Sequence, residues 1–345
     1  MNIRSMAAST LVAGLLAWVA SGNASAQGAP IEFNYGYTTA DHVNLYVAQD
    51  LKLFEKAGLK PNFFTFPSGA PLLAALKSES LDVVTAGLGF AFALGQKIPL
   101  TMLYWNSNDS TGEGLVVDAK SGIKSFQDIA KAKKIGAASG TCAQVALYLM
   151  AKKVGIEYSK LDVVNIPAPL LRNSFLSNSI DAGIAWSPYS VVLDAEGYKV
   201  VSWDSEYTPP GGLCPRTTAA RPAFLKAHPE IGVRLLQVDA LATEAVAKNP
   251  QLAYDAVAKR LSLPPAVAKA AVERVYMQRP TYAQQLDPAS PYSMTSKDGG
   301  LAGKYLQATQ VLLETKSISE PVPMSVIQGA IDPTYLKQFV ERGGK

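Results

Sequence analysis

Small polar residues stand at the start of three predicted helices, where they could bind an anion. They are Ser139-Gly140-Thr141, Thr38-Thr39 and Ser68-Gly69. A helix start without bulky side chains leaves backbone N–H groups and the positive end of the helix dipole open to a ligand, which favours an oxyanion. Helix capping is the competing interpretation, because Thr141 with Gln144 three residues later fits a capping box.

Two arginines could give such an anion a fixed positive partner. Arg216 stands in a segment rich in Gly, Pro and Thr, and Arg172 stands at the start of a later predicted helix. A guanidinium binds a carboxylate or sulfonate through two parallel hydrogen bonds. We expect Arg216 to be the main anchor, since burying an anion without a positive partner is very costly. A salt bridge is the alternative for Arg216, and exposure to solvent is the alternative for Arg172.

Aromatic side chains near predicted strand ends could contact the body of the ligand. Phe90 follows the turn Gly87-Leu88-Gly89, and Trp186 and Tyr189 follow a later strand; we add Asn106, near a predicted crossing between two halves of the molecule. Several aromatic residues on such loops favour an apolar or ring-shaped ligand, such as a phthalate- or benzoate-like carboxylate. Packing in the core is the competing interpretation for most aromatic residues.

Few residues could carry out acid–base, nucleophilic or metal chemistry. The chain has two histidines, of which His42 stands in the first turn of the first predicted helix. It could contact the ligand, or it could be a surface residue beside a helix cap. The sequence has no His/Cys/Asp cluster at metal-ligand spacing, no Gly-x-Ser-x-Gly elbow and no P-loop. We therefore expect no enzymatic activity, no bound metal and no cofactor.

The two cysteines could be free or joined. Cys142 lies in the first turn of a predicted helix, and Cys214 lies two residues before Arg216. After export, both would meet an oxidising compartment. A disulfide would require their Cα atoms to lie within about 7 Å of each other. The spacing in the sequence does not establish that bond, so it stays open.

Composition and the first residues point to an exported protein. Residues 1–26 read as a signal peptide, because Arg4 precedes the apolar run Leu11–Ala20 and Ala24-Ser25-Ala26 resembles a cleavage site. We expect the mature protein to be soluble in the periplasm. The net charge of +4 is dispersed among acidic residues, which argues against a nucleic-acid partner. A length of 345 residues allows about two domains.

The residues above must be positioned by alternating strands and helices. Strands are predicted at 31–37, 60–66 and 81–87, with a helix at 41–59 that ends at Gly58 and another that starts at Ser68. This alternation predicts a largely parallel sheet covered by helices. After Arg221 the chain is mostly helical, with several helices that start at or just after Pro, and we expect these helices to pack on the first part of the fold.

A short internal repeat indicates a second unit of the same topology. "ALKSESLDVVTAG" (75–87) aligns without gaps with "SFLSNSIDAGIAW" (174–186). Each copy is a helix end, a Ser-x-Ser turn, an apolar-Asp pair and an apolar strand, although a match this short can arise by chance. Ligands bind beyond the carboxyl ends of strands in open α/β sheets. Two such units facing each other would form a cleft between Gly87 and Trp186.

Several longer stretches show a family resemblance. They are "FEKAGL", "LDVVTAGLGFAFALGQKIPL", "GLVVDAKSGIKSFQDIAKAKKIGAASGT" and "IDAGIAWSPYSVVLDAEG". With them, the chain from Ile31 to Lys316 resembles the periplasmic binding proteins of ABC importers for taurine, aliphatic sulfonates and nitrate. The resemblance implies a type II fold of two α/β lobes, joined by a hinge of two crossover segments. We place lobe 1 at 27–108 and 217–345 and lobe 2 at 109–216.

The resemblance also implies a function. It predicts a solute-binding component of an ABC importer, acting as a monomer, that closes over a small organic anion and delivers it to the transmembrane subunits of the permease. Gly-Leu-Gly-Phe-Ala (87–91) lacks the hydroxyls that the family has at this turn, which favours an aromatic carboxylate over an aliphatic sulfonate. Two alternatives remain: an enzyme like the thiamine pyrimidine precursor synthases, which share this fold, and a binding protein that serves a sensor.

Overall fold

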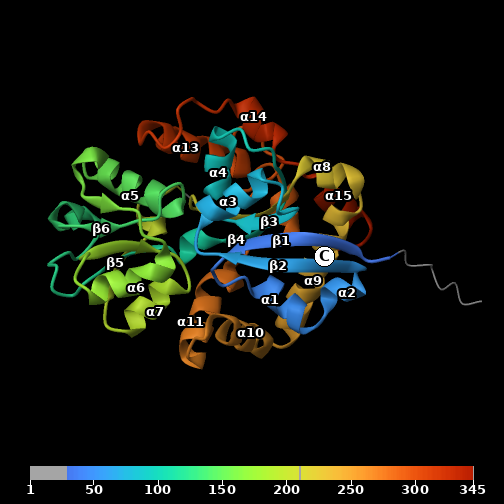
Figure 1. The fold of residues 1–345 in the computed structure, drawn as a ribbon, viewed down its shortest axis with the longest axis horizontal. Helices are drawn as coiled ribbons and strands as arrows, with labels where there is room; N and C mark the ends of the chain where they lie inside the picture. The colour runs from blue at the N-terminus through green and yellow to red at the C-terminus, as the bar shows by residue number, and fades with distance from the viewer. Residues whose placement is uncertain (1–28, 210, 345) are drawn as a thin grey trace, which may run out of the picture.

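The chain is divided between two five-stranded sheets (Figure 1). The computed structural model describes residues 29–209 and 211–344, so the predicted signal peptide lies outside the described residues. We call each sheet, with the helices that pack on it, a lobe. Among the described residues, no helix has the length and apolar character needed to cross a membrane.

The sheet of the first lobe has the strand order β2-β1-β3-β10-β4. β1 (Ile31–Thr38) is parallel to β2 (Leu59–Phe66) and to β3 (Val83–Ala86). β10 (Pro215–Ala220) runs antiparallel between β3 and β4 (Thr101–Asn108). The parallel strands all end at the edge that faces the second lobe, which is where the sequence placed the ligand.

Helices cover both faces of this sheet (Figure 1). Those between the strands are α1 (Val43–Asp50), α2 (Leu53–Lys56), α3 (Gly69–Lys77) and α4 (Gly89–Gly95). The chain after Arg221 is mostly helical, as predicted. α9 packs against α1 and α13 against α4 of the first lobe, whereas α11 also contacts α7 (Tyr189–Ala195) of the second lobe. The helices after Arg221 are α8 (Pro222–Ala227), α9 (Ile231–Lys248), α10 (Gln251–Leu261), α11 (Pro265–Val275), α12 (Tyr282–Leu286), α13 (Gly300–Glu314), α14 (Met324–Gly329) and α15 (Thr334–Glu341), with the 3-10 turn η5 (Tyr276–Gln278) after α11.

The single helix predicted over 41–59 is two helices. α1 ends at Asp50, and Lys52 adopts a left-handed conformation with φ 54° before α2 begins. Gly58, at φ 68°, ends α2, as expected for a glycine after a helix. The break follows from packing, because Leu53 and Phe54 are both buried in the core of the first lobe after the chain changes direction.

The second lobe repeats this arrangement with shorter strands. Its sheet has the order β7-β6-β8-β5-β9. β6 (Ile135–Gly136) is parallel to β7 (Val163–Val164) and β8 (Ala182–Ala185), whereas β5 (Gly114–Val117) is antiparallel to β8 and β9 (Lys199–Trp203). Its helices are α5 (Cys142–Lys153), α6 (Ala168–Leu176) and α7 (Tyr189–Ala195), with 3-10 turns η2 (Phe126–Lys131) and η3 (Tyr158–Lys160).

The internal repeat is a structural repeat. Residues 75–87 end α3 and form β3, and residues 174–186 end α6 and form β8. Glu79 and Asn178, which are equivalent in the alignment, both adopt left-handed backbone conformations, with φ 60° and φ 53°. The Ser-x-Ser turns also match, because Ser78 and Ser177 donate to the carbonyl oxygens three residues earlier.

The repeated aspartates make equivalent contacts. Asp82 accepts a hydrogen bond from the backbone N–H of Asn34 at 2.9 Å, and Asp181 accepts one from that of Lys134 at 2.9 Å. In each lobe the donor lies in, or directly before, the parallel strand next to the aspartate: Asn34 is in β1, and Lys134 precedes β6. The sequence pattern therefore reflects one way of fixing a helix end to a strand, used once in each lobe.

Two segments join the lobes. The first runs from β4 through the 3-10 turn η1 (Asp109–Thr111) to β5, and the second runs from β9 through η4 (Asp204–Glu206) to β10. Arg216 lies on β10, opposite Ser107 of β4. The residue that we placed last in the second lobe therefore belongs to the sheet of the first lobe.

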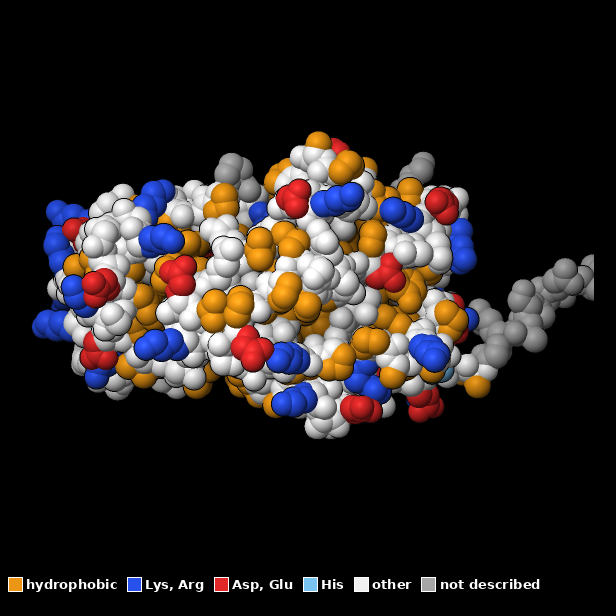
Figure 2. Space-filling view, turned by 90° about the horizontal axis from the view of Figure 1, so that it is seen from above, with side chains coloured by type: hydrophobic (Ala, Val, Ile, Leu, Met, Phe, Trp, Pro, Cys, Tyr) orange, Lys and Arg blue, Asp and Glu red, His pale blue; other side chains and the backbone are white. Residues whose placement is uncertain are grey.

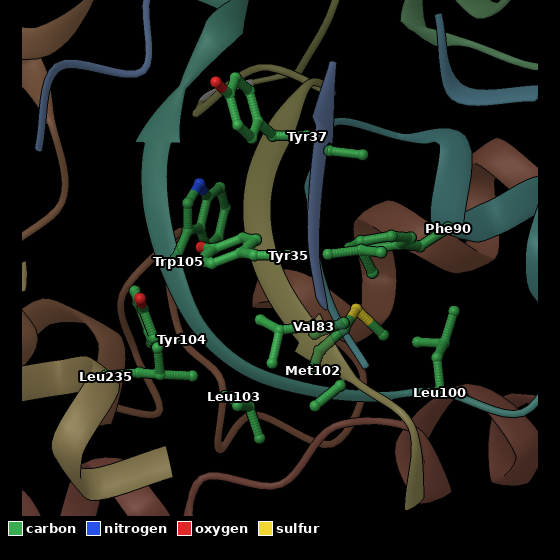
Figure 3. Close-up of a cluster of buried hydrophobic side chains, with 14 of the residues drawn as sticks. Tyr35, Tyr37, Val83, Phe90, Leu100, Met102, Leu103, Tyr104, Trp105 and Leu235 are labelled. Atoms are coloured by element: carbon green, nitrogen blue, oxygen red, sulfur yellow. The ribbon is translucent and has the colours of Figure 1, made fainter. Parts of the chain in front are cut away.

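Large side chains fill the first lobe on both sides of its sheet (Figure 3). Phe90 is fully buried there, and its neighbour on α4, Ala91, is buried with it. The prediction that Phe90 contacts a ligand is therefore not supported by its position, because the start of α4 turns this ring into the core. Trp105 is also a core residue, as the competing interpretation held, and its indole N–H donates to Ser107 O at 2.6 Å.

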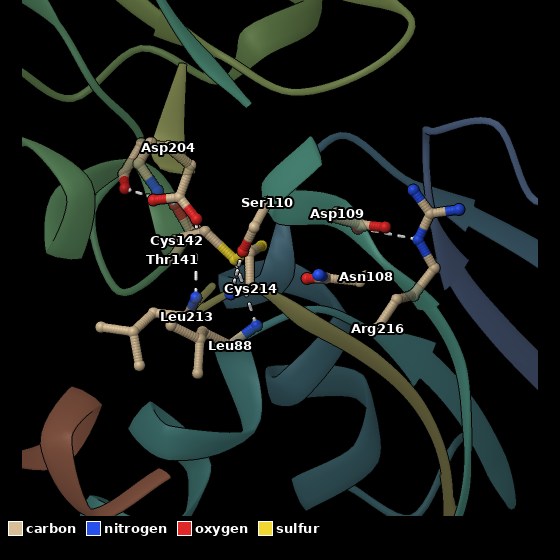
Figure 4. The surroundings of a disulfide bond; sticks show 12 residues. Leu88, Asn108, Asp109, Ser110, Thr141, Cys142, Asp204, Leu213, Cys214 and Arg216 are labelled. Atoms are coloured by element: carbon tan, nitrogen blue, oxygen red, sulfur yellow. Dashed lines mark hydrogen bonds and ion pairs between the residues drawn. A yellow bond between two sulfur atoms is a disulfide. The ribbon is translucent and has the colours of Figure 1, made fainter. Parts of the chain in front are cut away.

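A disulfide joins Cys142 to Cys214, with 5.6 Å between their Cα atoms (Figure 4). This answers the question that the sequence left open. The bond ties the first turn of α5 to the second crossover segment. Both sulfurs pack against Gly87 of the first lobe, where a Cβ atom would lie 3.1 Å from the Cys142 sulfur. A Cβ atom at that turn would be crowded by the sulfur, so glycine favours this contact.

Charged side chains of both signs are interspersed over the face of the molecule in Figure 2. Lysines and arginines are most frequent at the left end of that view, aspartates and glutamates are scattered, and hydrophobic side chains gather along its middle. The mixture of both signs agrees with the dispersed charge of the sequence.

Candidate ligand-binding site

A cavity of about 420 Å³ lies between the two lobes. Both lobes and both crossover segments contribute to its wall, and we call it the cleft cavity. Its lining residues are Thr38, Ala40, Ser68, Gly69, Ala86, Gly87, Leu88, Gly89, Asp109, Glu113, Thr141, Cys142, Trp186 and Cys214. Seven of the predicted site residues are among them: Thr38, Ser68, Gly69, Gly87, Leu88, Thr141 and Trp186.

Strand ends and helix starts meet at the cleft cavity. β1, β3 and β8 end beside it, at Thr38, Gly87 and Trp186. α3 and α5 begin beside it, and Ser68 precedes α3 without using its hydroxyl as a side-chain cap. The positive ends of these two helix dipoles therefore face the same cavity, which favours a ligand with negative charge.

Thr141 caps α5 and also lines the cavity. Its hydroxyl accepts from Ala143 N at 3.2 Å and donates to Ala138 O at 2.7 Å, while Gln144 accepts from Gly140 N at 2.7 Å. The predicted capping pair thus exists, shifted by one residue from the ideal capping box.

Ser139 and Gly140 do not line the cleft cavity. The backbone N–H of Ser139 donates to Asn165 at 2.9 Å, and that of Gly140 is taken by Gln144. Gly140 has φ +70° and stands against the ring of Phe92 of the first lobe. Of the polar turn that precedes α5, the structure brings Thr141 alone to the cavity wall.

Arg216 is held by two carboxylates instead of lying free for a ligand. It is 3% exposed, and its guanidinium contacts Asp41 and Asp109 at 2.8 Å each, as well as the Asp41 carbonyl oxygen at 3.0 Å. Burial lowers the pKa of Arg216, but Asp109 and Asp41 outweigh burial and hold that pKa above its usual value. The salt-bridge alternative therefore describes this arginine, and the expectation of an unpaired anchor is wrong.

Arg172 lies far from the cleft cavity on the surface of α6. It pairs with Glu196 at 2.6 Å, and its side chain is 51% exposed. The sequence predicted that Arg172 lies at a helix start, where its positive charge would be unfavourable without a bound anion. The helix starts four residues earlier, at Ala168, so this requirement disappears.

Four other predicted residues lie next to the cleft cavity without lining it. His42 and Asn106 line a neighbouring cavity together with Arg216, Thr39 contacts the second lobe, and Tyr189 packs edge-on against Trp186. His42 is buried, contrary to the expected surface position, and Nε2 lies 2.7 Å from Thr38 O. Burial, with Arg216, holds the pKa of His42 well below its usual value.

The lobes meet through polar contacts on both sides of the cavity. Trp186 Nε1 donates to Thr39 O at 3.3 Å, and Ser187 Oγ donates to Asp41 at 2.7 Å. On the other side, Gln144 of α5 donates to Ser317 at 2.8 Å. These contacts hold the two lobes against each other on either side of the cavity.

Comparisons with known proteins agree with this architecture. A family model described as NMT1/THI5 like matches residues 39–253, more than half of the chain. The chain belongs to the NMT1/THI5-like family. A provisionally named binding protein of Brucella abortus is 27% identical over 220 residues, which are 63% of this chain and 67% of that protein.

Two solved structures show the same fold. The alkanesulfonate-binding protein of Xanthomonas axonopodis pv. citri, solved with bound MOPS, has a TM-score of 0.72 at 19% identity, covering 89% of this chain and 100% of that one. The periplasmic nitrate-binding protein of Synechocystis PCC 6803 has a TM-score of 0.72 at 11% identity, covering 91% and 89%. The two-lobed periplasmic binding protein fold expected from the sequence is therefore confirmed.

The part of this NMT1/THI5-like chain that matches the family model contains almost the whole cleft cavity. Among the lining residues, Thr38 alone falls before residue 39. The match also includes both crossover segments and the disulfide.

Sequence reasoning missed two acidic residues in the cavity wall. Asp109 and Glu113 line it, from the first crossover segment, and both are buried. Burial raises the pKa of Asp109 to about 6, although Arg216 opposes this shift. Burial also raises the pKa of Glu113 well above its usual value, helped by Asp204 and Asp109. Their position at a predicted hinge beside a predicted cleft was the available signal.

Proposed function

We propose that this protein is the periplasmic solute-binding component of an ABC importer, and that it captures a small organic anion in the cleft cavity. The observation that carries the proposal is the meeting of two helix starts and three strand ends at a cavity between two lobes. An anion there would interact with Thr141 and Ser68 and with the positive ends of the α3 and α5 helix dipoles. The names of the related binding proteins support the same class of ligand.

The ligand is a sulfonate or a small carboxylate with an apolar part. The space between the lobes is narrow, which limits the ligand to a small molecule. Trp186 is the aromatic residue in the cavity wall, and Ala40, Ala86 and Leu88 add apolar surface. Trp186 is therefore the aromatic residue that could contact the aromatic carboxylate favoured by the sequence, because Phe90 lies in the core.

Ligand capture couples to movement of the lobes about the two crossover segments. A closed state is favoured only if the ligand binds it more tightly than the open state. Residues from both lobes line the cleft cavity, so a ligand that touches Ser68 and Thr141 together would make its full set of contacts only after closure. The closed, loaded form is then the one delivered to the permease.

The cavity wall is suited to binding and not to catalysis. Its two cysteines are joined in the disulfide, and its remaining polar side chains are hydroxyls, carboxyls and one indole. The nearby His42 lines the neighbouring cavity instead, and its Nε2 is engaged by Thr38 O. These features support a binding protein over an enzyme like the thiamine pyrimidine precursor synthases.

Calorimetry with a panel of anions tests the proposal. Titrations of the exported protein would use alkanesulfonates, benzenesulfonate, taurine, nitrate, and aromatic mono- and dicarboxylates. We expect one-site binding for at least one member, and Trp186→Ala should weaken it by about tenfold or more, as for a buried aromatic contact. Phe64→Ala, a matched change at an exposed aromatic residue of β2, should leave the affinity unchanged. Binding of a sugar or a cation, with no response to any anion, would overturn the proposal.

A further inference from the structure

Glu113 has an unusual position for an acidic residue. It lies between η1 and β5, it is 1% exposed, and it lines the cleft cavity. Its Oε2 atom is buried and has no hydrogen-bond partner within the described part of the chain. One of its carboxyl oxygens lies within 4.8 Å of both sulfurs of the disulfide, which is part of the same wall. Leaving a buried polar atom without a hydrogen-bond partner is costly. A ligand in the cavity could supply the partner that Oε2 lacks.

The charged groups around Glu113 do not neutralise it. Asp109 of η1 and Asp204 of η4 are the nearest acidic groups that act on it, and each would repel a negative charge there. On β10, Arg216 is paired with Asp41 and Asp109. The first turn of α5 and the end of the second crossover segment contribute the uncharged disulfide. From α13, Lys304 is committed to the carbonyl oxygen of Gly212. From the η4 segment, Tyr207 is buried with its hydroxyl unpartnered.

An ionised Glu113 would therefore be a buried charge without a partner, beside two other carboxylates. That arrangement is very costly, and a bound anion in the same cavity would raise the cost further. The neutral acid avoids both penalties, and its O–H group is a hydrogen-bond donor in a residue that lines the cleft cavity. A hydrogen bond from O–H to an ionised oxygen is short and strong.

We propose that Glu113 binds the ligand as a neutral carboxylic acid, whose O–H donates a hydrogen bond to the anionic group. This inference rests on the proposed function, and it names the residue that replaces Arg216 as the recognition group for the anion. The raised pKa of Glu113 agrees with it. A consequence follows for the binding equilibrium: the complex forms with Glu113 protonated, so raising the pH until Glu113 ionises in the free protein must weaken anion binding.

The contrasting arrangement is an ionised Glu113 that contacts a positively charged group of the ligand. The two arrangements differ in what glutamine does at this position. Glutamine has nearly the same shape, is always neutral and can donate through its amide. It therefore replaces a protonated glutamate well, whereas it cannot replace a carboxylate that pairs with a cation.

Calorimetry of Glu113→Gln and Glu113→Leu decides between them. The probes are benzenesulfonate and ethanesulfonate, which remain ionised between pH 6 and pH 9, together with the anion of the panel that binds best. At pH 6, E113Q should bind within about threefold of the unmodified protein, and E113L should bind about tenfold or more weakly, the usual cost of losing a charge-assisted hydrogen bond. Equal loss in both variants, or no loss in either, would overturn the inference.

The pH dependence of anion binding gives a second test. It compares the unmodified protein with E113Q, so it does not require E113L to fold. Across the pH range in which Glu113 ionises, the affinity of the unmodified protein should fall relative to that of E113Q, because E113Q has no proton to lose. Asp109 and Asp204 titrate in both proteins, so the comparison with E113Q isolates the part of the pH dependence that requires Glu113. Parallel pH profiles would overturn the inference while leaving the proposed function intact. Failure of every anion to bind the unmodified protein would instead overturn the proposed function.

Discussion

Ser187 of the second lobe donates a hydrogen bond to Asp41 of the first lobe, with 2.7 Å between the two oxygens. The other carboxyl oxygen of Asp41 contacts Arg216, at 2.8 Å. Asp41 thus joins the sheet of one lobe to the strand-end loop of the other. Since β10 and Asp41 belong to the same lobe, the Asp41–Arg216 pair can stay in place while closure of the cleft brings Ser187 to Asp41.

Removing this contact should weaken ligand binding by destabilising the closed state. Ser187→Ala should raise the Kd of the cognate anion by about tenfold, because a hydrogen bond to a charged group contributes about 1.5–3 kcal/mol. Ser177→Ala, at an exposed turn of the same lobe, is the control and should not change the Kd. Unchanged affinity in Ser187→Ala, measured by calorimetry, would show that this hydrogen bond does not contribute to closure.

Arg216 should matter for folding in a way that Arg172 does not. Arg216→Ala leaves Asp41 and Asp109 buried without their shared cation, and we expect the free energy of unfolding to fall by about 3–5 kcal/mol. Arg172→Ala removes an exposed ion pair and should cost about 0–1 kcal/mol. Urea unfolding followed by circular dichroism measures both. Equal effects of the two variants would contradict the buried arrangement of Arg216.

The disulfide should stabilise the protein strongly. It closes a loop with a sequence separation of 72, for which the chain-entropy model gives about 4 kcal/mol. The double variant Cys142→Ser/Cys214→Ser should unfold at lower temperature and lose sensitivity to reductant. Thiol titration of the denatured, unreduced protein should find no free thiol. Two free thiols would contradict the bond.

Buried carboxyl groups near the hinge should make stability fall as the pH rises. Burial raises the pKa of Asp204 to about 6, from an ordinary value of 3.8, so the folded protein holds a proton that the unfolded chain has lost. The free energy of unfolding should therefore decrease between about pH 4 and pH 6. Asp204→Asn should flatten this decrease, whereas Asp298→Asn, at an exposed position, should not. An increase over this range in the unmodified protein, relative to Asp204→Asn, would contradict the raised pKa.

The repeated helix–strand units of the fold could be predicted from the sequence because local patterns determine them, whereas the antiparallel strands that make both sheets mixed were not predicted. The repeat at 75–87 and 174–186 specifies a helix end, a left-handed residue and a strand in each lobe, and these features need no long-range information. The polar turn that ends at Thr141 was recognisable for the same reason, since a helix cap is made by neighbouring residues.

The electrostatics of the site could not be read from the sequence in the same way. Arg216 has partners 175 and 107 residues away, and nothing local indicates that Asp41 and Asp109 converge on it. Phe90 was misplaced because the direction of a side chain at the start of a short helix depends on how that helix packs. Glu113 was missed because an acidic residue in a Gly-rich segment reads as exposed until the two crossover segments bury it.

A second hollow, of about 930 Å³, offers the ligand a competing location. It lies beside the second crossover segment and is lined by Trp203, Arg274 and Tyr292, among others. The guanidinium of Arg274 lies over the ring of Trp203, at 3.5 Å from its centroid. It is larger than the cleft cavity, but it lacks the meeting of strand ends and helix starts that distinguishes the cleft cavity.

A crystal structure with the best-binding anion of the panel is the most direct test of the central claim. We predict that the ligand occupies the cleft cavity, with its anionic oxygens within hydrogen-bond distance of the helix starts at Ser68 and Thr141 and of the Glu113 carboxyl group. Trp186 should contact its apolar part. A ligand found beside Arg274 and Trp203, with the cleft cavity holding only water, would contradict the account.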